Sequence, residues 1–185
     1  MSLLRNSVLG ALVLAAVALT PKAVLADEGV PIDGTFAVSF MRPAAPSAVT
    51  GPYCASGGTP IEAQGIGSVS KVGPLFLTVK KCLTFPVAFP AGVYTGTFKM
   101  TAGNGDTLEG TYEGTQDFSL KDENGYGPFQ GTLTFTGGTG RFSNARGVLT
   151  FAAVTSPVSV GFTAPTVNGM AYYLVQGNMV SPKKH

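Results

Sequence analysis

Apolar and polar residues alternate along the segment from Tyr94 to Tyr112, with Gly103-Asn104-Gly105 in its middle. Successive side chains of a β-strand point to opposite faces of the sheet, so a period of two predicts strands that are apolar on one face only. Asn and Gly between two such runs are typical of a tight hairpin turn. We therefore predict an antiparallel hairpin here.

The same alternation constrains the register of this hairpin. A two-residue turn at Asn104-Gly105 would place Met100 opposite Glu109 and mix the two faces. Centring the turn on Asn104 keeps the faces apart and leaves Gly105 in a left-handed conformation. The predicted partners are Met100 with Leu108, Phe98 with Gly110, Gly96 with Tyr112, and Lys99 with Glu109. The last pair joins opposite charges, and aromatic rings over glycines suit a tightly curved sheet.

Comparable runs recur along the chain, separated by glycine and proline at intervals of eight to twelve residues. After residue 26 no segment has a 3.6-residue apolar period, so little helix is expected. A short piece at 158–162 is either a ninth strand or part of a long loop. The eight predicted strands are 34–41, 61–71, 74–82, 93–101, 107–117, 128–136, 146–154 and 171–180. Antiparallel strands in this number close most economically into a barrel, so the predicted fold is all-β, a single antiparallel eight-stranded barrel.

A barrel of the outer-membrane type would also show alternating strands. Its lipid-facing side would carry large apolar residues with aromatic girdles, around a polar interior. Here the more apolar face has glycines among its aromatics, and the other face carries Thr, Glu and Lys. The pattern therefore favours an apolar interior over a membrane barrel.

Residues 1–26 have the features of a secretory signal peptide. Arg5 precedes an uncharged apolar run from Val8 to Leu19, and Val24-Leu25-Ala26 places compact residues before a cleavage site. A run of this length spans only about 18 Å as a helix, whereas a bilayer core is about 30 Å thick. We predict cleavage, no membrane span afterwards, and a β-barrel domain of residues 27–185 in the periplasm or outside the cell.

Removing residues 1–26 changes the charge balance. The full chain has 12 Lys and Arg against 10 Asp and Glu, and two of the basic residues, Arg5 and Lys22, lie in the leader. The remaining domain has 10 of each and no basic stripe, which disfavours nucleic acid as a partner.

Cys54 and Cys82 are the two cysteines of the chain. In an exported protein such a pair most simply forms a disulfide bond. By closing the loop between the two cysteines, this bond would stabilise the folded state by about 3 kcal/mol. A metal site is disfavoured because two thiols and one histidine, His185, do not supply four ligands.

The glycines of the Gly137-Gly138-Thr139-Gly140 segment resemble those of a phosphate-binding loop. The segment lies between two predicted strands, however, with no helix after it and no Lys-Ser/Thr. We predict a structural turn in which Gly137, Gly138 and Gly140 supply conformational freedom. The neighbouring Arg141 and Arg146 are assigned structural or solvated roles.

No catalytic constellation is predicted. The single histidine is the last residue, which disfavours a Ser-His-Asp or Cys-His arrangement. Glu109, Glu113 and Asp117 share one strand at intervals of about 13 Å, beyond the separation of paired glycosidase carboxylates. The acidic segments 104–106 and 122–124 match no EF-hand spacing, and no cofactor is expected.

Three motifs carry a family resemblance: Asn104-Gly105-Asp106, then Gly137 to Phe142, then Ala145-Arg146-Gly147. With the segment 65–77 they resemble small secreted bacterial β-barrel proteins, which are similar to the allene oxide cyclase and dirigent barrels. Dirigent proteins orient phenoxy radicals without cofactors, and allene oxide cyclases steer a ring closure by substrate shape. No catalytic residue of either family matches a position here. The Thr-His that many relatives have in the second strand is replaced in the segment 70–73.

These observations predict an exported, non-catalytic barrel that binds a small apolar or aromatic ligand, or a partner through its loops. The candidate ligand-binding residues are Tyr94, Phe98, Tyr112 and Glu62. One alternative is a cofactor-free cyclase or isomerase of the allene oxide cyclase type, with a deep pocket lined by aromatic residues. Another is a surface or matrix structural protein. Neither the ligand nor the oligomeric state follows from the sequence.

Overall fold

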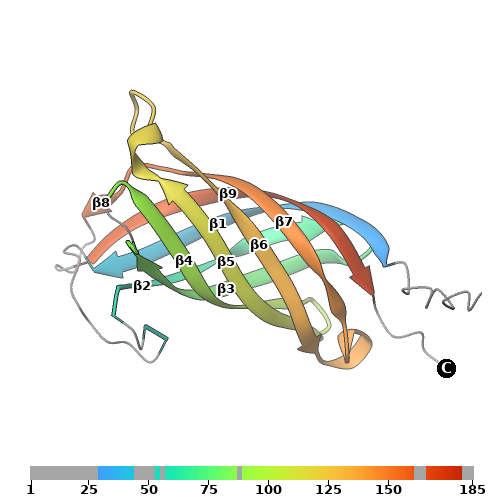
Figure 1. Ribbon diagram of the computed structural model, residues 1–185. Helices are drawn as coiled ribbons and strands as arrows, with labels where there is room; N and C mark the ends of the chain where they lie inside the picture. Colours follow the sequence, from blue (N-terminus) through green and yellow to red (C-terminus); the bar gives the residue numbers. More distant parts are fainter. Residues whose placement is uncertain (1–28, 44–52, 55–56, 87–88, 161–165, 181–185) are drawn as a thin grey trace, which may run out of the picture.

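Eight long strands form a closed antiparallel barrel in the computed structural model, which describes residues 29–43, 53–54, 57–86, 89–160 and 166–180 (Figure 1). The strands are β1 (Val30–Pro43), β2 (Thr59–Val69), β3 (Gly73–Thr84), β4 (Ala91–Ala102), β5 (Thr107–Asp117), β6 (Gly127–Gly138), β7 (Arg146–Thr155) and β9 (Thr166–Val180). Each pairs with its neighbour in this order, and β1 pairs with β9 to close the barrel. The predicted all-β, eight-stranded fold is confirmed.

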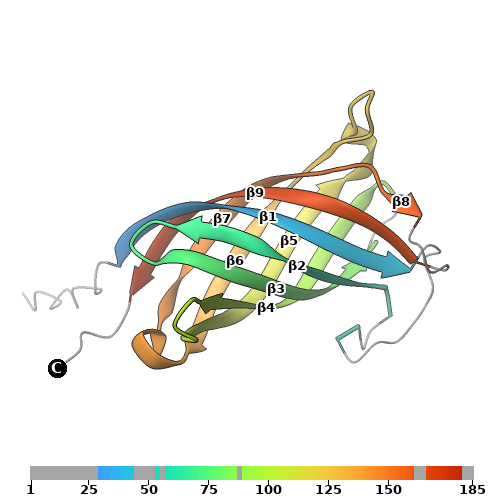
Figure 2. The ribbon, with the colours of Figure 1, turned by 180° about the vertical axis from the view of Figure 1, so that it is seen from behind.

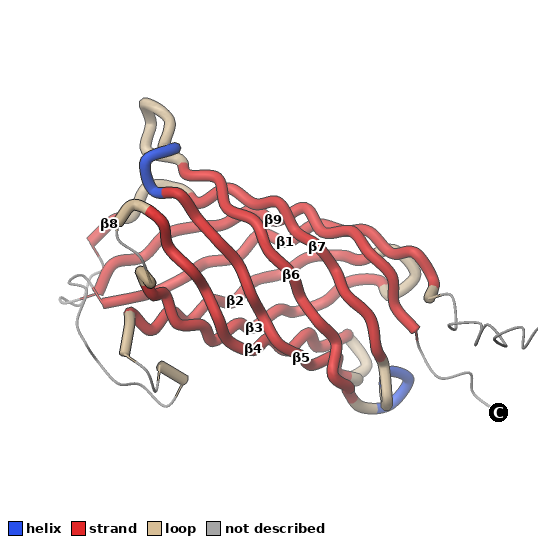
Figure 3. The backbone as a smooth tube through the Cα atoms, viewed as in Figure 1, coloured by secondary structure: helices blue, strands red, loops and turns tan. Residues whose placement is uncertain are grey.

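The short strand β8 (Ser159–Val160) adds to β9 beyond the end of β7. It coincides with part of the ninth piece predicted at 158–162, whose last two residues lie outside the described ranges. The part of the chain that the structure describes has two 3₁₀-helices at opposite ends of the barrel, η1 (Phe118–Leu120) and η2 (Gly140–Phe142) (Figure 3). No helix in the described ranges is long and apolar enough to cross a membrane. The predicted signal peptide lies outside those ranges.

The β4–β5 hairpin has the register predicted from the parity of its residues. Met100 faces Leu108, Phe98 faces Gly110 and Lys99 faces Glu109. Gly105 adopts φ +86°, as the three-residue turn requires. The Lys99 ammonium lies 3.4 Å from the Glu109 carboxylate on the outer face.

Gly110, which faces Phe98 in the β4–β5 hairpin, lies where two neighbouring strands approach closely. A Cβ on Gly110 would lie 1.9 Å from the Thr134 carbonyl oxygen and 2.8 Å from the Phe98 ring. No side chain fits that space, so glycine at this position allows the Phe98 ring and the backbone of β6 to pack closely against β5.

β1 and β9 are longer than the sequence pattern predicts. They start and end at Val30–Pro43 and Thr166–Val180, rather than at 34–41 and 171–180. The two strands pair with each other over their shared length, from Val30 opposite Met179 to Pro43 opposite Thr166 (Figure 2). This ladder joins the two ends of the chain, so the backbone hydrogen bonds that extend each strand come from a distant segment.

The barrel has two distinct ends. The hairpin end carries the β2–β3 and β4–β5 turns together with η2. The disulfide end carries the Cys54–Cys82 pair, η1 and β8 (Figure 1). At the hairpin end Gly140 has φ +55°, and a Cβ on Gly138 would lie 2.0 Å from the Thr107 carbonyl oxygen. Gly137 and Gly138 are the last two residues of β6, paired with β5, and the turn itself begins at Thr139 and continues through η2.

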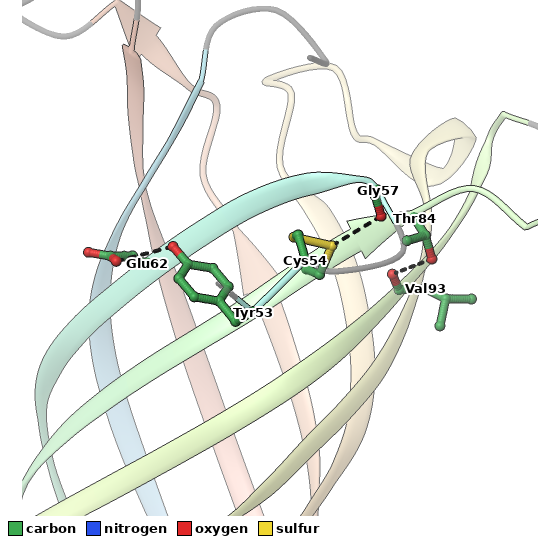
Figure 4. The surroundings of a disulfide bond; sticks show 7 residues. Tyr53, Cys54, Gly57, Glu62, Thr84 and Val93 are labelled. Atoms are coloured by element: carbon green, nitrogen blue, oxygen red, sulfur yellow. Dashed lines mark hydrogen bonds between the residues drawn. A yellow bond between two sulfur atoms is a disulfide. The ribbon is translucent and has the colours of Figure 1, made fainter. Parts of the chain in front are cut away.

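The Cys54–Cys82 disulfide is present, with the two Cα atoms 5.3 Å apart (Figure 4). It joins Cys54, which precedes β2, to Cys82, which lies near the end of β3. A Cβ on Gly58 would lie 2.6 Å from the Cys82 sulfur, so the backbone packs directly against the bond. The disulfide therefore fixes the wall at this end of the barrel.

Candidate functional site

A lysine points into the barrel from β3. Leu75, Leu77 and Val79 alternate along this strand with their side chains buried, and Lys81 is next in the same series. Its side chain is only 5% exposed, because the position faces the interior between Val79 and Leu83. The sequence-based candidates did not include Lys81, although this alternation places it on the apolar face.

The amine of Lys81 lies among aromatic side chains. Its Nζ donates a hydrogen bond to the Tyr112 hydroxyl at 3.2 Å, and that hydroxyl lies 3.4 Å from the hydroxyl of Tyr173. The rings of Tyr94, Tyr112 and Phe129 have their centroids 4.4, 4.7 and 5.1 Å from Nζ. We refer to Lys81, Tyr94, Tyr112, Phe129 and Tyr173 as the lysine–aromatic cluster.

Burial perturbs the ionisable groups of this cluster. Loss of hydration lowers the pKa of Lys81 to about 7. The same cause raises the pKa of Tyr173 to about 12, and the pKa values of Tyr94 and Tyr112 also rise. No carboxylate within the described ranges forms an ion pair with Lys81. The tyrosines are therefore neutral hydroxyls, whereas the charge on the lysine changes near neutral pH.

A chain of hydrogen bonds runs from this cluster toward the disulfide end. The Tyr94 hydroxyl donates to Gln116 Oε1, and Gln116 Nε2 donates to Thr155 Oγ1 at 3.2 Å. Thr155 in turn donates to the Gly127 carbonyl oxygen at 3.1 Å. We call Gln116, Thr155 and Gly127 the polar rim. Because its members satisfy one another, polar groups can remain buried there.

Two of the four predicted ligand-binding residues meet in this cluster. Tyr94 and Tyr112 both lie over Lys81, but Phe98 packs against Phe135 toward the hairpin end, with ring centroids 5.8 Å apart. Glu62 does not join them. Its side chain lies on the outer face, where it accepts a hydrogen bond from the Tyr53 hydroxyl at 3.1 Å (Figure 4). Strand parity explains this, since the side chains on either side of Glu62 in β2 are the buried ones.

An apolar groove of about 790 Å³ lies along the outer wall near the disulfide end. Its most exposed apolar side chains are Leu174 and Leu120, at 65% and 60% exposure, with Tyr172 and Val154 beside them. Outward-facing polar residues of β5 and β6 also line the groove: Thr115, Asp117 and Gln130. We call this feature the outer groove.

Strand register brings the apolar lining together. Tyr172 of β9 faces Val154 on one side and Ala37 on the other, and Leu174 faces Ala152. The sequence signal for this surface was the run 172–175, where apolar residues occupy both faces of a strand. On β4, β5 and β6 the corresponding outward positions are rich in threonine. The apolar part of the outer wall is thus a patch centred on Val154, Tyr172 and Leu174, whereas the outward face of β1 also carries Asp33, Thr35 and Ser39.

Three of the other acidic residues have partners within the protein. Glu109 pairs with Lys99, and the carboxylate of Asp117 accepts from the backbone amide and hydroxyl of Ser119. These bonds to Ser119 lower the pKa of Asp117. Asp122 accepts from the backbone amides of residues 124 and 126 and so shapes its own turn. Among the described residues no three His, Cys, Asp or Glu side chains gather as a metal site.

The two arginines that follow the glycine-rich segment, Arg141 and Arg146, also form hydrogen bonds to other residues of the protein. Arg141 donates to the Val72 carbonyl oxygen at 2.9 Å and lies 3.8 Å from the Asp106 carboxylate. Arg146 donates to the backbone carbonyl oxygens of Thr136 and Ala145. Both side chains fasten the hairpin end.

No protein-family model matches this sequence, and no curated protein matches it. The resemblance to the allene oxide cyclase and dirigent barrels therefore stays a prediction. The features that bear on function are the lysine–aromatic cluster, the polar rim and the outer groove.

Proposed function

We propose that this protein is an exported, non-catalytic barrel that binds a small apolar or aromatic molecule in the outer groove. The observation that carries the proposal is the groove itself, about 790 Å³ with four exposed apolar side chains. Its volume lies within the range of ligand pockets, about 300–1,000 Å³, and its mostly apolar lining is typical of them.

The outer wall is a better candidate than the interior that the sequence led us to expect. Side chains from all eight strands fill the inside of the barrel, and Tyr112, Phe135 and Leu149 are fully buried there. An eight-stranded barrel is just wide enough to be filled in this way. The cyclase alternative needs an open pocket between Tyr94 and Tyr112, and the Lys81 amine occupies that position.

The lining favours a ligand with one polar end. Tyr172 and Leu174 offer an aromatic and an aliphatic surface, while Asp117 and Gln130 offer hydrogen-bonding groups on the other side of the groove. A flat molecule with a hydroxyl or amine at one edge would satisfy both sides. A ring stacked on Tyr172 would gain about 0.5–1.5 kcal/mol beyond the burial of its area.

Export is part of the proposal and has two supports. The predicted signal peptide is one. The second is the Cys54–Cys82 disulfide, because such bonds persist in oxidising compartments. Edman sequencing of the protein secreted by its host should begin at or near Asp27.

A neutral fluorescent probe, N-phenyl-1-naphthylamine, tests the binding site. We expect saturable binding, weakened at least tenfold by Leu174→Gln and clearly reduced by Val154→Thr, since both changes remove apolar lining. Val148→Thr is the matched control, because Val148 is a similarly exposed valine of the same strand that does not line the groove. Equal affinity of all three variants and the unmodified protein would contradict the proposal.

The alternative of a surface or matrix structural protein makes a different prediction for the same surface. If the apolar outer wall buries itself against other copies, the protein will associate as its concentration rises, and Leu174→Gln will prevent this. Sedimentation velocity over a hundredfold concentration range separates this outcome from a monomer that binds the probe.

A further inference from the structure

We propose that the ligand of the outer groove is a long single-chain amphiphile, whose cationic head lies at Asp117 and whose alkyl tail continues across β1 onto β2 and β3. This inference rests on the proposed function, because it concerns the same groove, and it adds the chemical class of the ligand. It is carried by an exposed row of apolar side chains that extends beyond the groove.

Five outward-facing apolar residues lie in register on consecutive strands from β7 to β3. Val154 pairs with Tyr172, and Tyr172 also pairs with Ala37 of β1. Ala37 pairs with Ile66 of β2, which in turn pairs with Phe76 of β3. We call these five residues the apolar row. Four of its strands, β9, β1, β2 and β3, lie side by side on the face shown in Figure 2.

The apolar row is more exposed than the fold requires. Ile66 has 69% of its surface exposed, and Phe76, Tyr172 and Val154 are exposed as well. Outward positions of an antiparallel sheet that face water are ordinarily polar, as the threonines of β4–β6 are. A contiguous exposed apolar surface of this kind is typical of a binding site.

A second groove, of about 710 Å³, lies along the far part of the apolar row. Thr35 and Ala37 line both grooves, so the two adjoin on β1. Beyond them, the lining of the second groove includes Ile66, Ser68 and Phe76. A ligand longer than the outer groove therefore has a continuous path onto β2 and β3.

Strand register gives the length of this path. Thr115 of β5 lines the outer groove, Ser68 of β2 lines the second groove, and the pairs between them run through β6, β7, β9 and β1. These strand-to-strand steps span about 24 Å. With C–C bonds of about 1.5 Å, an extended alkyl chain advances about 1.3 Å per carbon, so sixteen carbons cover about 20 Å. An eight-carbon chain covers about 10 Å and would stay in the outer groove.

The curvature of the wall favours a flexible chain over a flat partner. The apolar row crosses consecutive strands of a closed barrel, so its side chains point in progressively different directions. A rigid flat surface would touch only part of the row at one time, whereas an alkyl chain bends to follow it.

The charge distribution favours a cationic head. Among the described residues that line the two grooves, Asp117 is the one charged side chain. Hydrogen bonds from the Ser119 hydroxyl and backbone amide lower the pKa of this carboxyl group, so it is ionised at neutral pH. Both bonds are accepted by Oδ1, and we assign the other carboxylate oxygen, Oδ2, to the cation. An ammonium head there places the tail against Tyr172 and the rest of the apolar row.

Isothermal titration calorimetry tests the length of the site, with trimethylammonium compounds that carry eight, twelve or sixteen alkyl carbons, each below its micelle concentration. Complete burial of one methylene raises affinity about fourfold, and an open groove that covers half of the chain gives about twofold per carbon. Affinity should therefore rise about tenfold from eight to twelve carbons and again from twelve to sixteen. Equal affinities at twelve and sixteen carbons would overturn the extension into the second groove. Absence of binding for all three would overturn it together with the proposed function.

Ile66→Thr tests the second groove separately from the first. It should weaken the sixteen-carbon compound severalfold and leave the eight-carbon compound and N-phenyl-1-naphthylamine unchanged, because only the long chain reaches β2. Val148→Thr is again the matched control, since this exposed valine lines neither groove. An equal effect of Ile66→Thr on the short and long compounds would contradict the extension. Failure of Leu174→Gln to weaken N-phenyl-1-naphthylamine would contradict the proposed function instead.

Asp117→Asn tests the head group. Asparagine keeps an acceptor for Ser119 and removes the charge. The change should weaken dodecyltrimethylammonium severalfold and narrow its advantage over dodecanoate, which has a twelve-carbon chain and an anionic head. If dodecanoate binds the unmodified protein as tightly as dodecyltrimethylammonium, the cationic head is wrong.

Sedimentation velocity of the protein without ligand tests a second copy as the occupant of the apolar row. We expect a monomer over a hundredfold concentration range, both for the unmodified protein and for Ile66→Thr. Association that Ile66→Thr abolishes would show that another copy of the chain covers the row, and would overturn the proposal.

Discussion

The two halves of the barrel interior obey the same alternation rule but differ in chemistry. Toward the hairpin end the inward side chains are apolar, including Phe98, Met100 and Phe135. Toward the disulfide end the inward positions include Lys81 and Gln116, each buried with hydrogen-bonding partners. The hairpin-end half therefore stabilises the fold by burying apolar area. The disulfide-end half holds polar groups in fixed places, and burying them is energetically unfavourable.

The largest expected effect lies in the apolar half. Phe135→Ala should lower the free energy of unfolding by about 3–5 kcal/mol, because it removes a fully buried ring and leaves a cavity. Urea unfolding followed by circular dichroism measures this. Phe76→Ala is the control, since Phe76 lies on the outer wall with 43% of its surface exposed. A similar small cost for both changes would mean that this half is not the stabilising one.

Removing the disulfide should affect the other half. Changing Cys54 and Cys82 together to serine should lower the free energy of unfolding by about 3 kcal/mol, since the bond closes a separation of 28 residues. Amide hydrogen exchange should accelerate near Thr59 and Thr84 and stay slow around Met100. Uniform acceleration over both ends would contradict a difference between the two halves.

Lys81→Met should stabilise the protein by about 1–4 kcal/mol near neutral pH, because it removes a buried charge. The folded pKa of Lys81 is about 7, whereas an unfolded lysine titrates near 10.4, so the unfolded state binds more protons between these values. The cost of Lys81 is therefore complete below pH 7 and fades as the pH rises toward 10.

Urea unfolding of the unmodified protein and of Lys81→Met at pH 6 and pH 9 measures this difference. The advantage of methionine should be larger at pH 6. The tyrosines around Lys81 stay protonated in the folded state over this range, since burial raises the pKa of Tyr173 to about 12 and also raises the pKa values of Tyr94 and Tyr112. An advantage independent of pH would show that burial does not perturb Lys81.

Local alternation was sufficient to predict the barrel, its eight strands and the β4–β5 register, because strand parity and a turn are properties of neighbouring residues. It was not sufficient for the ladder between β1 and β9, which joins the two ends of the chain. Glu62 was assigned to the ligand site by its chemistry alone, and parity places it on the outer face. Lys81 was missed because a lysine was not expected on an apolar face, although its neighbours at intervals of two residues are buried.

The smallest effect is expected for Tyr94→Phe, which tests whether hydrogen bonds to the polar rim stabilise the disulfide-end half of the barrel. Tyr94→Phe removes the hydroxyl that donates to Gln116 Oε1 and leaves this buried oxygen without that donor, which should lower the free energy of unfolding by about 1–2 kcal/mol. Tyr126→Phe is the control, because 40% of the surface of Tyr126 is exposed. Its effect should stay within about 0.5 kcal/mol. If Tyr94→Phe were equally neutral in urea unfolding, the rim would be dispensable for stability, and the lysine–aromatic cluster would have to be held by ring packing alone.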